Sequence, residues 1–461
     1  MSHQDRSRGL ALNSRHLDQA LQWLLAGISW KSIALRQDCT WTPRILVRAA
    51  LLWAWSDELT LEERFSTSRR LVAHLAPQHG PLAESSQAFM KLLRRWTASL
   101  VSLVVIALRE RVRKTLSGQW ECCGFAVFGV DGSRVELPRT KSHEAAYSAS
   151  PKRSGKKKRN RRKQPGSAAA TKKANVPQMW LTTLFHVGTG LPWNWRTGPS
   201  DSSEREHALD MLESLPQKGL LTGDAGFVGY DFAQAILRSG RHLLIRVGAN
   251  IKLLRKLAYV RESEGTVYVW PDKAAKNLLP PLVFRLVVAQ GPRHPIYLIT
   301  SVRNSKKLSD QAVRGLYRKR WLVELFYRHL KQTFQKRKLR SLSAENAAVE
   351  LEWSLVGLWG LGLSAAVEIA KDEVPLSRIS MAGVLKSFRR LMRDYLHPAE
   401  RGQSLCALLR RALVDTYLRK NKASRDYPRK RKHERTGSPT IADATAQQIK
   451  QARMLKFLEK G

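Results

Sequence analysis

The sequence predicts a mixed α/β protein with a strand-rich middle between two helical regions. Residues 17–116 carry apolar side chains at helical spacing, as in Leu17-x3-Leu21. From Phe125 onward the pattern changes to short apolar runs bounded by turn residues, which is typical of buried strands. Residues 382–418 return to helical spacing. A chain of 461 residues, 43% of them apolar, is long enough for two to four domains with sizeable cores.

The first 118 residues are expected to form a helical N-terminal domain. Their Arg and Lys content would suit the binding of DNA. A helical cap with a solvated basic face fits the same pattern equally well, so the sequence leaves both interpretations open.

Several segments in the middle of the chain are expected to be strands. They are 125–131, 179–187, 219–226, 242–247, 266–270, 282–289 and 296–302. Helices are expected over 204–215, 230–238 and 317–331. Two of the strands deliver an aspartate into a glycine-containing turn, Asp131 at the end of the first and Asp224 near the end of the third. Asp before Gly is also a common turn former, which is the alternative interpretation of both residues.

Charge is the strongest compositional signal. The chain has 80 Lys and Arg against 38 Asp and Glu, a formal net charge of +42. Such an excess of positive charge would attract a polyanion. Nucleic acid is the best candidate for this partner, because neutralising its phosphates releases condensed cations. A membrane surface is not expected, since no basic amphipathic anchor or lipidation motif is present. The apolar run 353–367 is short for a membrane span and is interpreted as a buried helix.

The polar N-terminus lacks the apolar core of a secretory signal, and the cysteines have neither zinc-ligand nor redox spacing. The chain is therefore expected in a reducing cytoplasm.

Two strongly basic segments lie outside the expected elements. Residues 151–173 contain many Lys and Arg side chains. They belong to a basic flexible loop, expected over 151–175, that becomes ordered when it binds a polyanion. A nuclear import signal would have a similar composition. Residues 419–435 form a basic C-terminal tail.

The most informative segment is 317–331. At about 100° per residue, Tyr317, Arg320, Glu324 and Lys331 would lie within about 60° of one another around one helix. A separate apolar arc would pack on the core, formed by Trp321, Leu322, Leu325, Phe326 and Leu330. The helix would thus present a carboxylate flanked by phosphate-binding groups. A charged amphipathic surface helix is the alternative.

The four residues match Y-x2-R-x3-E-x6-K, so the chain resembles the DDE transposases of bacterial insertion sequences, in the group that is similar to insertion sequence four. The resemblance covers roughly 125–331. It implies a ribonuclease-H-like catalytic core over 119–240 and 303–370, an inserted β-strand subdomain over 241–302 and a helical C-terminal region over 371–461. In a bacterium, the protein would be cytoplasmic and associated with the nucleoid.

The same resemblance assigns site residues. Asp131, Asp224 and Glu324 would be the catalytic carboxylates that bind two Mg²⁺ ions, which Mn²⁺ could replace. Hard oxygen ligands are what such ions prefer, and two ions about 3.5–4 Å apart can activate a nucleophile and stabilise the leaving oxygen. Tyr317, Arg320 and Lys331 would contact phosphates of the DNA.

Some residues carry weaker assignments. Trp270 lies where related enzymes stack an aromatic on a flipped base, although a core position is the more common role of such a tryptophan. His186, His207 and His329 have no second ligand at metal spacing and are expected to be structural or surface residues.

These features favour a cut-and-paste transposase that cleaves element ends and joins them to target DNA, acting on double-stranded DNA as a homodimer in the synaptic complex. A metal-dependent, structure-specific nuclease or domesticated relative would keep the same fold. A non-catalytic basic nucleic-acid-binding protein would share only the charge.

Overall fold

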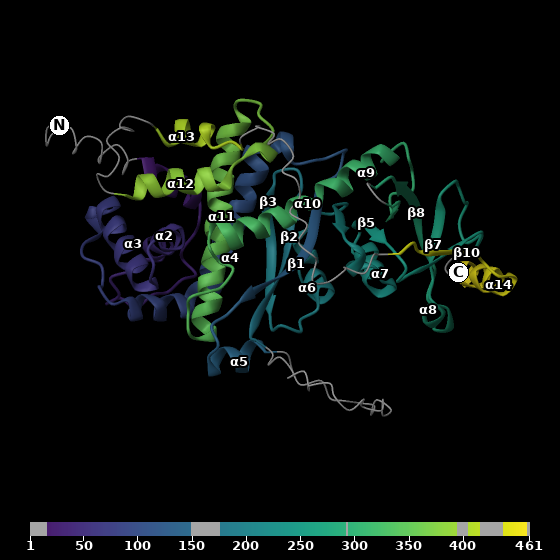
Figure 1. The fold of residues 1–461 in the computed structure, drawn as a ribbon, viewed down its shortest axis with the longest axis horizontal. Coiled ribbons are helices and arrows are strands. Elements are labelled where there is room, and N and C mark those ends of the chain that lie inside the picture. Colours follow the sequence, from purple (N-terminus) through teal and green to yellow (C-terminus); the bar gives the residue numbers. More distant parts are fainter. Residues whose placement is uncertain (1–15, 149–175, 292–293, 394–403, 415–436, 459–461) are drawn as a thin grey trace, which may run out of the picture.

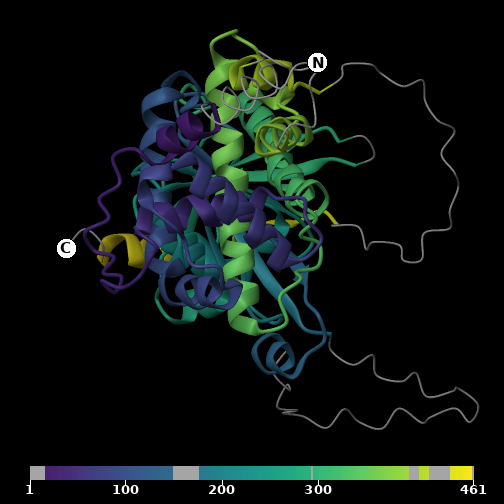
Figure 2. The same ribbon diagram turned by 90° about the vertical axis from the view of Figure 1, so that its left-hand side faces the viewer.

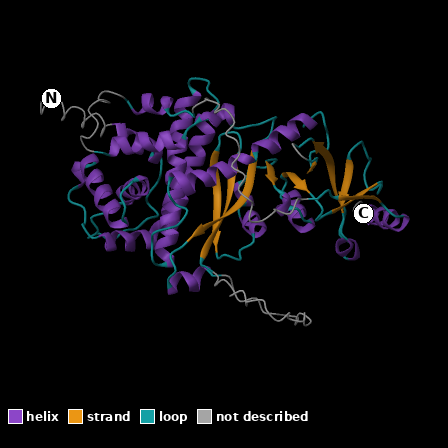
Figure 3. Ribbon diagram, in the orientation of Figure 1, coloured by secondary structure: helices purple, strands orange, loops and turns teal. Residues whose placement is uncertain are grey.

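The computed structural model describes residues 16–148, 176–291, 294–393, 404–414 and 437–458. Helices gather at one end of the molecule and strands at the other (Figure 3). The mixed α/β class predicted from the sequence is confirmed. The basic loop expected over 151–175 and the basic tail expected over 419–435 both lie entirely outside the described residues.

The N-terminal region is helical, as the apolar spacing predicts. It consists of a helix over residues 16–25, α2 (Pro43–Trp55), α3 (Leu61–Leu75) and the long α4 (Ser86–Thr115). Side-chain caps begin these helices because they satisfy backbone N–H groups that have no partner inside the helix. At α3, Thr60 and Glu63 form a reciprocal capping box.

Helix α11 (Ala344–Ala370) is the central support of the molecule. Figure 2 shows it behind the N-terminal helices, and it also contacts α12 (Met381–Met392), α13 (Leu405–Arg411) and the sheet. Close packing depends on glycine: a Cβ at Gly357 would lie 3.0 Å from Trp55 Nε1, which donates a hydrogen bond to the Gly357 carbonyl. Among the described helices, α11 alone is long and apolar enough to cross a membrane, and 83% of its apolar window is buried inside the protein. The buried helix predicted over 353–367 is confirmed.

A buried ion pair fixes α11 to the segment that precedes it. Lys336 Nζ lies 2.7 Å from Glu350 Oε1, and the two residues are 2% and 0% exposed. The other carboxylate oxygen of Glu350 accepts hydrogen bonds from the backbone N–H groups of Arg340 and Ser341 and from the Ser341 hydroxyl. The charge of Glu350 is therefore fully compensated without water.

Ten strands form one continuous sheet in the order β10-β6-β7-β8-β9-β5-β4-β1-β2-β3 (Figure 1). The first half along the chain consists of β1 (Val127–Glu136), β2 (Gln178–His186), β3 (Leu191–Gly198), β4 (Leu220–Gly223) and β5 (His242–Val247). Strands β1, β4 and β5 are parallel neighbours, whereas β2 and β3 continue antiparallel on the other side of β1.

The remaining strands extend the sheet beyond β5. They are β6 (Lys252–Arg255), β7 (Thr266–Val269), β8 (Leu282–Ala289), β9 (Ile296–Thr300) and β10 (Thr440–Asp443). Strand β9 pairs antiparallel with β5, and β10 returns from the C-terminal end of the chain to pair with β6. Residues 242–247, which the sequence analysis grouped with the inserted subdomain, pair in parallel with β4.

Helices cover the sheet and shape its site-bearing end. They are α5 (Lys141–Tyr147), α6 (Glu204–Asp210), α7 (Tyr230–Arg238), α8 (Asp272–Lys276), α9 (Asp310–Lys319), α10 (Trp321–Arg328) and α14 (Ala446–Leu458). Helices α6 and α10 both contact β1 (Figure 1). They bring two distant parts of the sequence to the same strand.

Most predicted elements are present, but three strands were missed. Strand β3 contains Pro192, Asn194 and Gly198, which are typical of turns, while β6 and β10 are four-residue strands with charged ends. The helix expected over 204–215 ends earlier, because a 3₁₀ turn over Leu212–Ser214 follows α6.

Replacing Glu350 by Gln should lower the free energy of unfolding by about 3–5 kcal/mol, because the ammonium of Lys336 would stay buried without a counter-charge. Denaturant unfolding monitored by tryptophan fluorescence measures the loss. The double variant Lys336→Met, Glu350→Leu should recover much of it, since neither charge remains. A stable Glu350→Gln protein would contradict the role given to this pair.

Candidate active site

Asp131 lies in the middle of β1. It is opposite Thr183 of the antiparallel neighbour β2, but the parallel pairing with β4 stops two residues earlier, at Gly129 and Thr222. The prediction that Asp131 ends its strand is therefore wrong, because pairing with β2 carries β1 on to Glu136. The carboxylate still lies beyond the end of the parallel ladder, where no strand covers it on that side.

Asp224 directly follows β4, as predicted. It begins the 3₁₀ turn Ala225–Phe227, and its Oδ1 accepts a hydrogen bond of 2.7 Å from the backbone N–H of Gly226. The turn-forming role considered in the sequence analysis is thus present. Since β1 and β4 are parallel neighbours, the chain after β4 leaves the sheet at the edge near Asp131.

The segment 317–331 is not one regular helix. Helix α9 ends at Lys319, Arg320 forms the junction, α10 ends at Arg328, and His329–Thr333 form a π-helical turn. A single helical wheel therefore does not describe the segment, because the junction and the wide turn change the direction of the following side chains. Lys331 lies in the π turn, in a position that uniform helical spacing would not give.

The apolar arc expected on this helix is partly wrong. Trp321 is 56% exposed, whereas Val323 and Tyr327, which were not assigned to the arc, are 0% and 5% exposed. Phe326 and Leu330 are buried as expected. Residues between the predicted positions therefore face the core of the protein.

Arg320 connects two of the predicted carboxylates. Its Nη2 lies 2.8 Å from Glu324 Oε1, and its Nη1 lies 3.8 Å from Asp131 Oδ2. Although burial opposes a charged guanidinium, Tyr317 and the carboxylates of Glu324 and Asp131 raise the pKa of Arg320 above its usual value. The guanidinium also lies over the Tyr317 ring, 5.8 Å from the ring centre. Arg320 thus supplies positive charge inside an acidic site.

Tyr317 and Lys331 lie on either side of this cluster. Burial raises the pKa of the Tyr317 phenol, whose charged neighbours include Arg320, Arg246 and Asp224. Lys331 Nζ donates a hydrogen bond of 2.7 Å to the hydroxyl of Ser133, two residues after Asp131 on β1. Burial lowers the pKa of Lys331. The structure therefore brings Tyr317, Arg320, Glu324 and Lys331 to the same region as the two aspartates.

The carboxylate of Asp131 is electrostatically coupled to both other acids. Burial, together with the smaller effects of the charges of Asp224 and Glu324, raises its pKa to about 6 against the opposing effects of the Gly132 N–H and Arg320. Two like charges close together disfavour ionisation of both, so a cation would be stabilising here. Asp131 is thus coupled electrostatically to acids that two other elements carry.

Sequence reasoning missed two residues of the site. Tyr327, one helical turn after Glu324, is buried under the site, and its hydroxyl donates hydrogen bonds to the carbonyls of Asp131 (2.6 Å) and Leu181 (3.2 Å). Glu204, the first residue of α6, is a further acid coupled to Asp131 and Asp224. The spacing of Tyr327 from Glu324 was a usable signal for the first, whereas nothing local marks Glu204.

Other residues singled out from the sequence lie away from this cluster or have structural partners. Trp270 is 4% exposed and donates its indole N–H to the Leu279 carbonyl, so it has no open face for a base. His186 is buried and bonded to Thr189 and the Trp120 carbonyl. His207 bonds Thr182, and burial lowers the pKa of His329 to about 4.

The donor set fits hard divalent cations, although its present arrangement is held by an arginine. Across the described ranges, no three His, Cys, Asp or Glu side chains are placed to hold a metal ion. Arg320 instead bridges Glu324 and Asp131. Carboxylate oxygens such as those of Asp131 and Glu324, which already share a cationic partner, are the type of ligand that hard divalent cations prefer.

Tyr327→Phe should lower the free energy of unfolding by about 1–3 kcal/mol, because two backbone carbonyls under the site lose a donor. Denaturant unfolding measures the effect. Tyr147→Phe is the matched control, since the Tyr147 hydroxyl makes one long hydrogen bond of 3.4 Å to the Ala344 carbonyl. Equal losses in the two variants would contradict a special role for Tyr327.

Asp131→Asn should change the pH dependence of the free energy of unfolding, measured in the presence of a metal chelator. The folded pKa of about 6 lies above the ordinary 3.8, so the proton on Asp131 stabilises the fold at low pH and that stabilisation is lost as pH rises through about 6. As pH rises from about 4 to about 8, the free energy of unfolding of the variant should therefore increase by on the order of 3 kcal/mol relative to that of the unmodified protein. Unfolding curves across this range measure the difference, and a constant difference would contradict the coupling.

Comparison with known proteins identifies the family. The model of the transposase DDE domain matches residues 125–358. Transposase InsG for insertion sequence element IS4 of Escherichia coli is 26% identical over 274 residues, 58% of this chain and 55% of that protein. A putative transposase for insertion sequence element IS4SA of Synechocystis is 25% identical over 174 residues, 37% of this chain and 47% of that protein. The chain thus spans about half the length of the curated relatives it matches.

A solved structure is also similar. The piggyBac transposase synaptic complex with hairpin DNA, determined by cryo-EM, aligns over 93% of this chain and 90% of that chain, with a TM-score of 0.39 and 11% identity. Similarity at this level decides neither fold nor activity. The family match, in contrast, covers about half of the chain and includes Asp131, Asp224 and Glu324. The chain belongs to the transposase DDE domain family.

Proposed function

We propose that this protein is a cut-and-paste DNA transposase of an insertion sequence. It cleaves DNA at the ends of the element and joins the freed 3′ hydroxyls to target DNA. The observation that carries the proposal is the coupling of Asp131 to Asp224 and Glu324 around Arg320, within a chain that belongs to the DDE family.

The catalytic core is proposed to be ribonuclease-H-like. Support comes from the strand order β3-β2-β1-β4-β5, with β2 antiparallel between β3 and β1 and with β1, β4 and β5 parallel. We also propose an inserted β-rich part after the core strands, and the strands that extend the sheet past β5 support this proposal. Because β5 pairs with β4, we place it with the core.

Asp131, Asp224 and Glu324 are proposed to hold two Mg²⁺ ions. Bound ions would activate the attacking water or hydroxyl and stabilise the charge on the leaving oxygen. The residues of the chain prepare this site in advance: Tyr327 fixes the backbone of Asp131, the Gly226 N–H fixes the carboxylate of Asp224, and Arg320 keeps Glu324 in place.

Tyr317, Arg320 and Lys331 are proposed to bind phosphates of the DNA strand. Arg320 would exchange its carboxylate partners for a phosphate, which a guanidinium binds through two parallel hydrogen bonds. Lys331 would leave the hydroxyl of Ser133, a neutral partner, for a charged one. The same movement of Arg320 would free Asp131 and Glu324 for metal.

The partners are proposed to be the double-stranded inverted-repeat ends and the target DNA. A net charge of +42 supports a polyanionic partner. Bringing two ends together implies a homodimer, at least on DNA. The expected location is the cytoplasm of a bacterium, in association with the nucleoid.

Glu324→Gln should abolish cleavage while leaving DNA binding within about twofold, because the carboxylate holds metal whereas Arg320 and Lys331 hold phosphate. The probe is a plasmid carrying the coding region with its natural flanking DNA. Supercoiled-plasmid nicking measures cleavage, and gel shift measures binding. Glu264→Gln, an exposed glutamate in the loop before β7, is the control and should cleave normally.

Joined products decide between the proposed transposase and a nuclease with the same site. Protein incubated with this plasmid and a second target plasmid should yield recombinants with the 3′ ends linked to target DNA. Cleavage without joined products would favour the structure-specific nuclease. Cleavage retained by Glu324→Gln would contradict the proposed site altogether.

A further inference from the structure

A fourth acidic side chain reaches the site from a different part of the chain. Glu204 is the first residue of α6, the short helix that follows β3 and contacts β1. Ser203 begins this helix by accepting a hydrogen bond from the Glu206 N–H. The backbone at Glu204 is thus fixed, and its side chain is directed from α6 toward the strand that bears Asp131.

The position of the Glu204 carboxylate is defined by its contact with Gly132. A Cβ built on Gly132 would lie 2.5 Å from Glu204 Oε1 and 2.6 Å from Glu204 Cδ. The carboxylate therefore occupies the space in which any other residue at position 132 would place its side chain. Gly132 follows Asp131 on β1, so Glu204 reaches the strand beside the residue that bears the first predicted metal ligand.

The carboxylate has no cationic partner. In the parts of the chain that are described, Glu204 makes neither a side-chain hydrogen bond nor an ion pair. The nearby arginines are engaged elsewhere: Arg205 donates to the Gly226 carbonyl at 2.8 Å, and Arg134 lies over the Trp180 ring at 4.7 Å. For a half-buried acid in a chain of net charge +42, this lack of compensation is unusual.

The charges that act most strongly on Glu204 are acidic. Burial, followed by the carboxylates of Asp131 and Asp224, raises its pKa to about 7 against weaker opposing effects of Arg134 and Arg205. Three carboxylates that repel one another at the end of the parallel strands are stabilised together by a cation of more than one charge.

We propose that Glu204 is a fourth oxygen ligand for the divalent cations that Asp131 and Asp224 hold. The proposal rests on the proposed function, because it requires a metal at these aspartates. It goes beyond the three-carboxylate site, since it adds a ligand from the helix between β3 and β4. Gly132 then has a specific role, which is to leave room for the Glu204 carboxylate.

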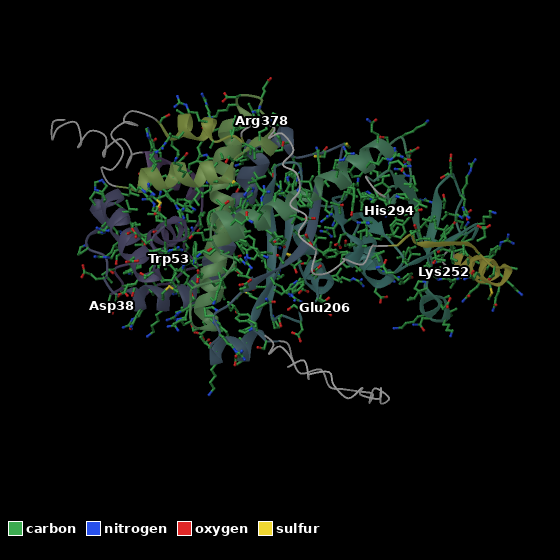
Figure 4. The ribbon with its side chains drawn as sticks, viewed as in Figure 1. Asp38, Trp53, Glu206, Lys252, His294 and Arg378 are labelled. Carbon is green, nitrogen blue, oxygen red and sulfur yellow. The ribbon has the colours of Figure 1, made fainter. Side chains whose placement is uncertain are left out.

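Metal binding by the full-length protein tests the proposal without DNA or activity. Mn²⁺ is titrated into each variant at neutral pH, and electron paramagnetic resonance measures the free ion. Glu204→Gln should weaken Mn²⁺ binding by about tenfold or more, as loss of a ligand does. The matched control is Glu206→Gln, two residues along the same helix, whose side chain is exposed near the margin of the molecule in Figure 4 and should bind normally.

Asp131→Asn separates failure of this proposal from failure of the proposed function. If Asp131→Asn weakens binding but Glu204→Gln equals the unmodified protein, Glu204 is not a ligand, and the three-carboxylate site stands. If Asp131→Asn itself leaves Mn²⁺ affinity unchanged, the metal site of the proposed function is wrong. If Glu204 only stabilises the start of α6, Glu204→Gln should lower the thermal stability of the protein and leave its Mn²⁺ affinity unchanged.

A double-mutant cycle tests the contact with Gly132. Gly132→Ala should weaken Mn²⁺ binding to a similar degree, because the new Cβ displaces the Glu204 carboxylate. In a Glu204→Ala background the same change should cost little more, since the obstructed atoms are gone. Independent, additive losses would show that Gly132 acts on Asp131 alone and would overturn the proposed contact.

Discussion

The guanidinium of Arg320, held between Asp131 and Glu324, is the interaction on which the site depends. It keeps acidic groups together that would otherwise repel one another, and it does so from the junction between two helices rather than from within one. Because Arg320 lies at the start of α10, its contact with Asp131 also links α10 to β1. Charge compensation and helix placement thus have the same cause.

The sheet and the central helix provide the rigidity that this arrangement needs. Parallel pairing of β1 with β4 sets the two aspartates at one edge, while antiparallel pairing with β2 extends β1 far enough for Ser133 to meet Lys331. Tyr327 joins α10 to both β1 and β2 through backbone carbonyls. Beyond α10, the Lys336–Glu350 pair anchors the chain to α11. The acidic site is therefore connected to the core on every side from which a residue enters it.

Much of the fold could be predicted from periodicity, because long amphipathic helices and apolar strands have clear patterns. Strand β5 and helix α7 have the predicted bounds, whereas β3 was missed because Pro192 and Gly198 are typical of turns. Edge strands such as β10 depend on a distant partner, and no local pattern specifies that partner. The end of α9 at Lys319 and the π turn over His329–Thr333 were not predicted either, since no Gly or Pro marks either position in the sequence.

For the site, the motif residues could be found from spacing, but their partners could not. Glu204 has no neighbouring signature, and only the fold brings it beside Gly132. Tyr327 was assigned to neither the polar nor the apolar face, because a buried tyrosine that bonds backbone carbonyls belongs to both. For Trp270 the sequence left open a core position and a base-stacking role, because it cannot show which face of a strand end is covered; the side chain is buried.

Strand β10 has a consequence for how the sheet is closed. The edge of the sheet at β6 is completed by residues 440–443, which are distant from β6 in the sequence, and Asp443 is joined there to Lys256 and Arg255. Without β10, the backbone of β6 would present an open hydrogen-bonding edge, the kind of surface through which sheets of different molecules associate. Protection of this edge against association therefore depends on a segment that local strand pairing does not supply.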